Sequence, residues 1–451
     1  MILEFIKSDL KKDNNLYKTI YDKIKLAVKL GIIKKGEKLP SVREAANELN
    51  VSRTTVENAY AKLCIEGIAE SRPQKGYYII TDEKIPENKY IYEENKESNI
   101  IYDFSSRKID TSAADTENWR KLIRYVLRDS FVLTSYGNPR GELKLRQALA
   151  SYTYKARGVI TKPENIVIGA GIGPLLNILC GIFKRDISVG IENGDFKEAQ
   201  SIFTDYGIKN FPMESDSNGV TTEALKETDA NILFLMPSAL SKISINGISR
   251  RRNEFKKWVE KENNRYIIED DYNGELRYTA RTLPAFQSKI PEKCIYIGSF
   301  SKLLLPSVRI AYMVLPDSLI EVFEEKMQYY NQTCGKTEQL ALTEYILSGN
   351  LEKHLRRLRR IYYSKNQLML KSLKRYPDIF KKITLFETSL IFEIKTNFKK
   401  DSHIIVEKCK EKGIVIMPSK EIGCIRLCFA GIPQEEISNA VNFLYNVLAE
   451  I

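Results

Sequence analysis

The sequence predicts an α/β protein of two units: a small helical unit with a β-hairpin, then a large unit with a mainly parallel sheet. The chain has 451 residues, more than one ordinary domain requires. Residues 82–99 are polar and lack apolar periodicity, which is typical of a linker. Beyond them, apolar runs alternate with helical stretches, the pattern of a parallel sheet covered on both faces. We therefore place the units at residues 1–81 and 100–451.

Composition limits the classes of function. The net charge of +12 favours a polyanionic partner. Seven cysteines without a C-x-x-C pair argue against a zinc site or a disulfide framework, and no His, Asp or Glu cluster has metal-ligand spacing. No apolar run approaches membrane-spanning length, and Met1–Leu10 carries charges too early for a signal peptide. We expect no metal, no membrane and a cytoplasmic location.

The N-terminal unit shows three helix signals. Apolar residues recur at helical spacing over residues 16–28, and Gly31 ends that pattern. Ser41 followed by Glu44 is a capping box, which predicts the start of a second helix. A third helix is expected to begin within Val51–Thr55.

A basic hairpin follows these helices. Two extended pieces, residues 68–71 and 77–80, flank the turn at 72–76, and this arrangement is typical of a winged helix-turn-helix, whose third helix enters the major groove. The stretch L-P-S-V-R-E-A-A-N-E-L-N-V-S-R-T-T-V-E-N-A-Y-A-K-L, residues 39–63, resembles the GntR-type DNA-binding domain. The resemblance implies a double-stranded DNA operator. By it, the residues that face DNA are Ser41, Arg43, Ser52, Arg53, Thr54, Thr55, Lys75 and Gly76.

The large unit places functional side chains after two of its strands. The predicted strands are Ile166–Ile168, Ile187–Val189, Ile232–Leu235, Tyr266–Glu269, Cys294–Ile297 and Ile310–Val314. The fourth runs into Asp270 and Tyr272, and the fifth is followed by Lys302; the carboxyl ends of such strands form ligand sites. Pyridoxal phosphate requires a set of this kind: a carboxylate, a hydroxyl, a lysine and an anion cradle.

The motifs E-D-D-Y and S-F-S-K…P-x-x-R resemble those of the fold-type I aminotransferases. The resemblance implies pyridoxal 5′-phosphate as cofactor, with Lys302 forming the aldimine and Asp270 pairing with the pyridine nitrogen. Tyr272 would contact the phenolate oxygen, and Arg309 would hold the phosphate. Small hydroxyl donors for the phosphate are expected from Ser299 and Ser301.

Two further segments match this cofactor site. The loop Gly169–Gly173 offers bare backbone to an anion at a helix N-terminus and matches the family's phosphate loop, so Ile172 and Gly173 are cofactor-binding candidates. Phe196 occupies the place where the family stacks an aromatic ring on the pyridine. A phenylalanine of the core would fit that position too.

The C-terminal part adds two signals. The run Leu351–Arg360 is strongly basic; it fits a solvated face, a nucleic-acid stripe or the G-H-L-x-R-H-L-R-R-M-R helix of MocR-type regulators. Residues 425–430 match the R-L-x-F-A strand whose arginine binds a substrate carboxylate, which makes Arg426 the effector-binding candidate. The whole chain resembles a MocR-type regulator. That resemblance implies a head-to-tail, domain-swapped homodimer and allows a small amino-compound effector.

Two segments depart from the family pattern. The family's P-S-H-Q-x-P-T-G is P-S-A-L-S-K-I-S at residues 237–244, and its A-G-L-H is T-S-L-I at 388–391. These losses weaken hydrogen bonding beside the cofactor ring, so we expect no efficient transamination. Three functions stay open: a regulator that senses an amino compound or pyridoxal phosphate, a working aminotransferase, and a regulator whose aminotransferase-like half only dimerises.

Overall fold

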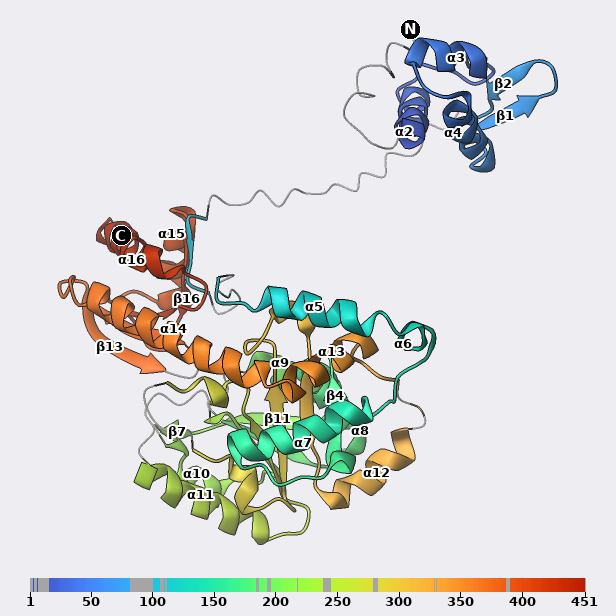
Figure 1. Ribbon diagram of the computed structural model, residues 1–451. Coiled ribbons are helices and arrows are strands. Elements are labelled where there is room, and N and C mark those ends of the chain that lie inside the picture. The colour runs from blue at the N-terminus through green and yellow to red at the C-terminus, as the bar shows by residue number, and fades with distance from the viewer. Residues whose placement is uncertain are drawn as a thin grey trace. The chain divides into compact units, whose positions relative to one another are not determined.

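The computed structural model describes residues 3, 6, 16–81, 100–105, 109, 112–183, 186–192, 196–216, 218–237, 245–278, 283–327, 329, 331–386 and 390–450. The chain divides into two compact units between residues 98 and 99 (Figure 1). The predicted linker, 82–99, lies outside the described residues.

The N-terminal unit consists of helices and a hairpin. Its elements are α2 (Leu16–Lys29), α3 (Val42–Leu49), α4 (Arg53–Ile65), β1 (Ala69–Arg72) and β2 (Gly76–Ile79). The predicted capping box is confirmed: the Glu44 backbone N–H donates to Ser41 Oγ over 3.1 Å, and the Ser41 N–H donates to Glu44 Oε2 over 3.3 Å. Ile24, Val56 and Leu63 are fully buried between the helices, so this unit has a core of its own.

The large unit is built on a mostly parallel sheet. Its seven described strands are β4 (Ile166–Gly169), β5 (Ser188–Glu192), β6 (Lys209–Met213), β9 (Ile232–Leu235), β10 (Tyr266–Asp270), β11 (Cys294–Ser299) and β12 (Ala311–Val314). They lie in the order β4-β12-β11-β10-β9-β5-β6, and β12 runs antiparallel to both of its neighbours. The predicted fold class is confirmed. The edge strand β6 was not among the predicted strands.

Helices cover both faces of this sheet (Figure 1). Their bounds are α5 (Thr116–Val126), α6 (Ser130–Thr134), α7 (Leu143–Arg157), α8 (Ile172–Ile182), α9 (Lys197–Asp205), α10 (Thr222–Glu227), α11 (Ile245–Glu260), α12 (Asp317–Met327) and α13 (Lys336–Leu347). Strand alternation sends Ile168 to the face of α7 and α13, and Val167 to the face of α8, α9 and α12. Beside the sheet, β7 (Ser215–Asp216) pairs with β8 (Gly219–Val220).

The C-terminal part forms a smaller layer. The long helix α14 (Asn350–Leu373) precedes a sheet of order β13-β14-β17-β16. Its elements are β13 (Phe380–Phe386), β14 (Ile391–Thr396), α15 (Ser402–Glu411), β16 (Met417–Pro418), β17 (Cys424–Cys428) and α16 (Ile437–Ala449). Separately, β3 (Tyr102–Asp103) pairs with β15 (Ile414–Val415), which ties the start of the large unit to its end.

Candidate functional site

Lys302 lies in the loop that joins β11 to β12. The last residue of β11, Ser299, pairs with Ala311 of β12. One residue earlier, a Cβ on Gly298 would come within 2.5 Å of the Tyr312 ring, so that ring occupies the space a larger residue would need. β11 ends at Ser299, and Lys302 follows three residues later at the carboxyl end of this strand, close to the end of β10.

Lys302 and the end of β10 are electrostatically coupled. The Lys302 Nζ lies 5.4 Å from the centre of the Tyr272 ring. Burial raises the pKa of Asp270 to about 8, with help from Asp271 and Glu198, while Lys302 opposes the rise. Burial also lowers the pKa of Lys302, against the charges of Cys428 and Asp270. A lysine with a lowered pKa has more of the neutral amine that attacks carbonyl compounds.

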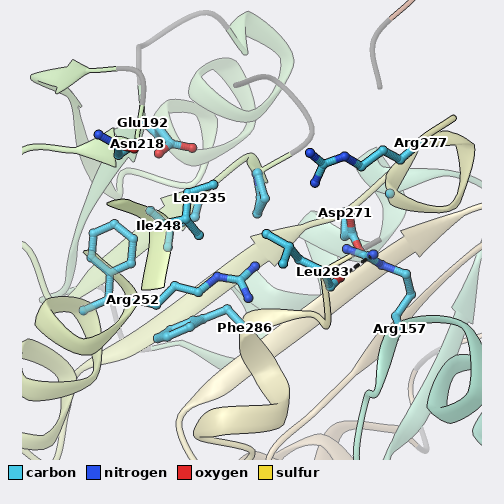
Figure 2. Close-up of a pocket in the computed structure, with 13 residues that line it drawn as sticks. Arg157, Glu192, Asn218, Leu235, Ile248, Arg252, Asp271, Arg277, Leu283 and Phe286 are labelled. Carbon is cyan, nitrogen blue, oxygen red and sulfur yellow. Dashed lines mark hydrogen bonds and ion pairs between the residues drawn. The ribbon is translucent and has the colours of Figure 1, made fainter. Parts of the chain in front are cut away.

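The neighbouring carboxylate, Asp271, has a structural role. Arg157 Nε donates to Asp271 Oδ2 over 2.6 Å, and the Tyr296 hydroxyl donates to the same oxygen over 3.0 Å. Figure 2 shows this pair beside a cavity of about 60 Å³ that Arg252 and Arg277 also line. The two adjacent aspartates thus differ in their partners: Asp271 is held by Arg157, whereas Asp270 lies where it opposes the lowering of the Lys302 pKa by burial.

Arg309 lies against the glycine-rich loop. It adopts a left-handed backbone conformation with φ +49°, and its Nη1 donates to Ser301 Oγ over 3.4 Å. A Cβ on Gly171 would lie 2.5 Å from Arg309 Nη2, so the guanidinium packs on bare backbone at the N-terminus of α8. Ile172 and Gly173 are the first two residues of that helix. A helix N-terminus, a hydroxyl and a guanidinium in one place fit a phosphate group.

The other two residues predicted for this site have partners within the chain. The Phe196 ring lies 5.9 Å from the Phe234 ring at an interplanar angle of 40°. Arg426 Nε donates to Glu393 Oε2 over 2.7 Å, and the Ser419 hydroxyl donates to the same oxygen over 2.8 Å. A carboxylate of the protein itself therefore pairs with Arg426.

Sequence reasoning missed three residues here: Glu393, Glu198 and Cys428. Glu393 lies opposite Arg426 in the register of β14 and β17, a pairing that neither segment reveals alone. Glu198 and Cys428 act on Asp270 and Lys302 through space, from a helix and a strand remote in sequence. Of the two divergent segments, residues 238–244 and 388–389 lie outside the described residues, whereas Pro237, Leu390 and Ile391 are described.

The residues predicted to face DNA lie at the starts of α3 and α4 and in the hairpin turn. Arg43, Arg53, Thr54 and Lys75 are exposed. Gly76 has φ +101°, a conformation that favours glycine.

Three hydroxyls in that set also hold the helices. Ser41 caps α3, while Ser52 accepts the Thr55 N–H over 3.1 Å and lies 2.7 Å from the Thr55 hydroxyl. These side chains therefore fix how each helix begins and so place Arg43 and Arg53 at the helix starts.

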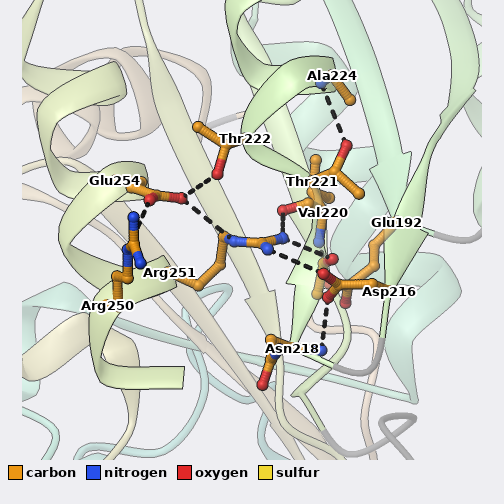
Figure 3. A network of polar contacts seen from close by, with 11 residues as sticks. Glu192, Asp216, Asn218, Val220, Thr221, Thr222, Ala224, Arg250, Arg251 and Glu254 are labelled. Carbon is orange, nitrogen blue, oxygen red and sulfur yellow. Dashed lines mark hydrogen bonds and ion pairs between the residues drawn. The ribbon is translucent and has the colours of Figure 1, made fainter. Parts of the chain in front are cut away.

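A second polar network lies away from Lys302. Arg251 of α11 donates to the carbonyls of Gly219 and Val220 and pairs with Asp216 over 3.0 Å (Figure 3). It also pairs with Glu254 over 3.2 Å. These contacts fasten α11 to the β7–β8 hairpin. Across the described ranges, no group of three or more His, Cys, Asp and Glu side chains could hold a metal ion. Nor does any described helix have the length and apolarity needed to cross a bilayer.

Two family models match the chain. The model of the bacterial regulatory proteins, gntR family, matches residues 16–79. The model of aminotransferase class I and II matches residues 100–444.

Relatives of the whole chain are transcriptional regulators. The uncharacterized HTH-type transcriptional regulator YdeL of Bacillus subtilis is 33% identical over 447 residues, which cover 96% of each chain. The HTH-type pyridoxine biosynthesis transcriptional regulator PdxR of Corynebacterium glutamicum is 27% identical over 79% of this chain and 78% of its own.

The solved structures that match share the fold of the large unit. One is LysN, the alpha-aminoadipate aminotransferase of Thermus thermophilus, solved in complex with N-(5′-phosphopyridoxyl)-L-leucine. It aligns with a TM-score of 0.66 at 22% identity and covers 78% of this chain and 94% of that one.

The raised pKa of Asp270 leads to a prediction about stability. Its carboxyl has a pKa near 4 in the unfolded chain and about 8 in the folded one, so folding binds a proton to this group, and its contribution to stability falls as pH rises from 4 to 8. The Asp270→Asn variant of the cofactor-free chain should gain roughly 1–4 kcal/mol in free energy of unfolding at pH 7. It should also show a weaker pH dependence.

Urea denaturation at pH 5, 7 and 8 measures this, with tryptophan fluorescence as the signal, since both tryptophans, Trp119 and Trp258, lie in the large unit. The control is Asp317→Asn, because hydrogen bonds from Asn165 and Lys162 lower the pKa of that carboxyl. If the Asp270→Asn variant is no more stable than the wild type at pH 7, the raised pKa of Asp270 is contradicted.

Proposed function

Since the chain belongs to the MocR-type transcriptional regulators, in which a gntR-family reader precedes an aminotransferase class I and II domain, we propose that it controls transcription in response to pyridoxal 5′-phosphate or an amino compound. One observation carries the proposal. Burial lowers the pKa of the Lys302 amine beside Asp270, and Arg309 bonds Ser301 in the same loop, in a chain that also matches a DNA-binding family; this combination supports the proposal. In this proposal residues 1–81 form the domain that binds a double-stranded operator, and residues 82–99 are the linker to the second domain. Residues 100–451 form that second domain, which holds the cofactor and dimerises.

The residues present fit the cofactor. When bound, pyridoxal phosphate supplies an aldehyde that amines attack and a ring that withdraws electrons. Lys302 would be the attacking amine, Asp270 would share a proton with the pyridine nitrogen, and Tyr272 would contact the ring oxygen. The phosphate would lie against Arg309 and the start of α8. Backbone or side-chain contacts there are proposed for Ile172, Gly173, Ser299 and Ser301, with Phe196 stacking on the ring.

Two candidate signals follow from this site. PdxR is named for pyridoxine biosynthesis, which supports the cofactor itself as a signal. The other is an amino compound whose amine replaces Lys302 and whose carboxylate binds Arg426. Such a carboxylate must compete with Glu393, which pairs with Arg426 over 2.7 Å. The departures at residues 237–244 and 388–391 support sensing over efficient transamination.

We further propose that the chain forms a head-to-tail, domain-swapped homodimer. Large apolar side chains are exposed along α5 and α6 and just beyond them: Tyr125, Phe131, Leu133 and Tyr136. Tyr136 is fully exposed. Soluble monomers rarely leave such a group of side chains in water. A sedimentation mass of one chain at micromolar concentration would exclude the dimer.

The cofactor proposal predicts which lysine is labelled. Borohydride reduction of the chain loaded with pyridoxal phosphate should leave a stable pyridoxyl group on Lys302, because burial lowers the pKa of this amine. Peptide mapping by mass spectrometry locates the label. Lys302→Ala is the control and should retain none after reduction. A label mainly on another lysine of the wild type would refute the assignment.

The reader proposal predicts two distinct losses of DNA binding. Arg53→Ala should weaken binding to the operator by about 1–3 kcal/mol if its guanidinium contacts a base. Lys75→Ala should weaken binding to all sequences alike and lower the salt slope by about 1, as expected for a phosphate contact. Lys18→Ala, on the exposed side of α2, is the control. Fluorescence anisotropy over a salt series measures all three; unchanged affinity in both test variants would refute the placement.

The whole proposal is tested by titrating operator binding with pyridoxal phosphate alone and then with an amino-acid panel. A true signal should change operator affinity by about 5- to 150-fold. Cofactor sensing predicts a response without any amine that survives Arg426→Ala. Effector sensing predicts a response that both Lys302→Ala and Arg426→Ala abolish. No response to any compound would favour the scaffold alternative, and steady turnover of an amino acid with a keto acid would favour the enzyme.

A further inference from the structure

The exposed face of α14 carries an ordered set of cations. Lys353, Arg356, Arg360 and Lys371 of the helix and Lys374, the residue that caps its C-terminus, are all exposed; we call these five residues the basic stripe. At 100° per residue they fall within an arc of about 60° on the helix surface. The one carboxylate of α14, Glu352, lies outside this arc. No ion pair joins any of the five to another residue that the structure describes.

The remaining arginines of the same run point inward. Arg357 donates to the Ala113 carbonyl over 2.8 Å, and Arg359 donates to the Glu275 carbonyl over 2.7 Å. The opposite face of α14 is buried through residues such as Leu355, Leu358 and Tyr362. The run Leu351–Arg360 therefore divides into arginines that anchor the helix and cations that face solvent. The anchored helix presents the stripe as a fixed surface.

The stripe has dimensions that suit a nucleic acid. From Lys353 to Lys374 the helix rises about 30 Å, close to one turn of B-DNA, about 34 Å. The cations form two groups, at residues 353–360 and 371–374, about 16 Å apart along the helix axis. Two such groups can each contact phosphates of one duplex, and each contact releases condensed counterions. The 18 residues between the units, 82–99, span at most about 60 Å when extended, which allows one duplex to reach both units.

We propose that the basic stripe binds the phosphate backbone of operator DNA outside the base pairs that the N-terminal unit reads. This inference rests on the proposed regulatory function and adds a second DNA-binding surface, on the large unit. The contacts are independent of sequence, because they involve phosphates alone. They lengthen the DNA footprint and strengthen binding only when flanking DNA is present.

The test compares three full-length proteins: wild type, the stripe variant Lys353→Gln/Arg356→Gln/Arg360→Gln and a control variant, Lys399→Gln/Lys408→Gln/Lys410→Gln. The control removes the same charge from three other exposed lysines of the large unit. The probe is the duplex that the wild-type chain selects from a random-sequence library, made without flanks and with about 20 base pairs added on each side. Unfolding temperatures show whether both variants fold.

With the flanked duplex, the stripe variant should bind about tenfold or more weakly than the control, and its salt slope should fall by about 3. With the short duplex, both variants should match the wild type. If the stripe variant and the control variant bind the flanked duplex with equal affinity, the proposal is overturned. An acidic protein would then be the partner to seek for the basic stripe. Equal losses on both duplexes would also overturn the proposal, because flanking DNA would then play no part.

The selection step separates this proposal from the proposed function. If the wild type selects no sequence, the regulatory function fails. The three proteins are then compared on a mixed-sequence 60-base-pair duplex at low salt, where the stripe variant should still bind more weakly than the control. Equal binding there would overturn the stripe as a DNA surface.

Discussion

The buried ion pair between Arg157 and Asp271 fixes the carboxyl end of β10, and the geometry of the candidate site depends on it. Both side chains are nearly inaccessible, and the Asp271 N–H also donates to the Ile297 carbonyl of β11 over 2.9 Å. Removing one partner of such a pair leaves an uncompensated buried charge, which is strongly destabilising. Both contacts of Asp271 fix the backbone next to Asp270, whose charge state affects the pKa of Lys302.

Asp270 illustrates a conflict between stability and function. Burial makes its ionised form unfavourable and raises the pKa to about 8, a cost that an asparagine would avoid. A carboxyl that retains its proton near neutral pH is suited to exchange that proton with a ring nitrogen. Ionisable groups whose pKa is shifted by burial in this way are commonly found at functional sites.

Local signals in the sequence were sufficient for much of the fold. The Ser41–Glu44 capping box and the apolar runs of the parallel strands depend on neighbours a few residues apart, and the structure has them at the predicted positions. The edge strand β6 could not be predicted from the sequence because Lys209 and Pro212 interrupt its apolar pattern. Such residues are usual where one edge of a strand faces solvent. The pairing of Glu393 with Arg426 could not be predicted either, because the register between two strands is set only in the folded sheet.

The Glu393–Arg426 pair makes the protein its own competitor for the carboxylate position. Glu393 is tethered beside the guanidinium at a fixed effective concentration, which no dilution changes. In the proposed effector mode, an external carboxylate binds Arg426 only by displacing Glu393. Because the tethered carboxylate competes at every effector concentration, it raises the apparent dissociation constant by a constant factor and leaves the shape of the binding curve unchanged. The hydroxyl of Ser419, which also binds Glu393, enlarges that factor by stabilising the closed pair.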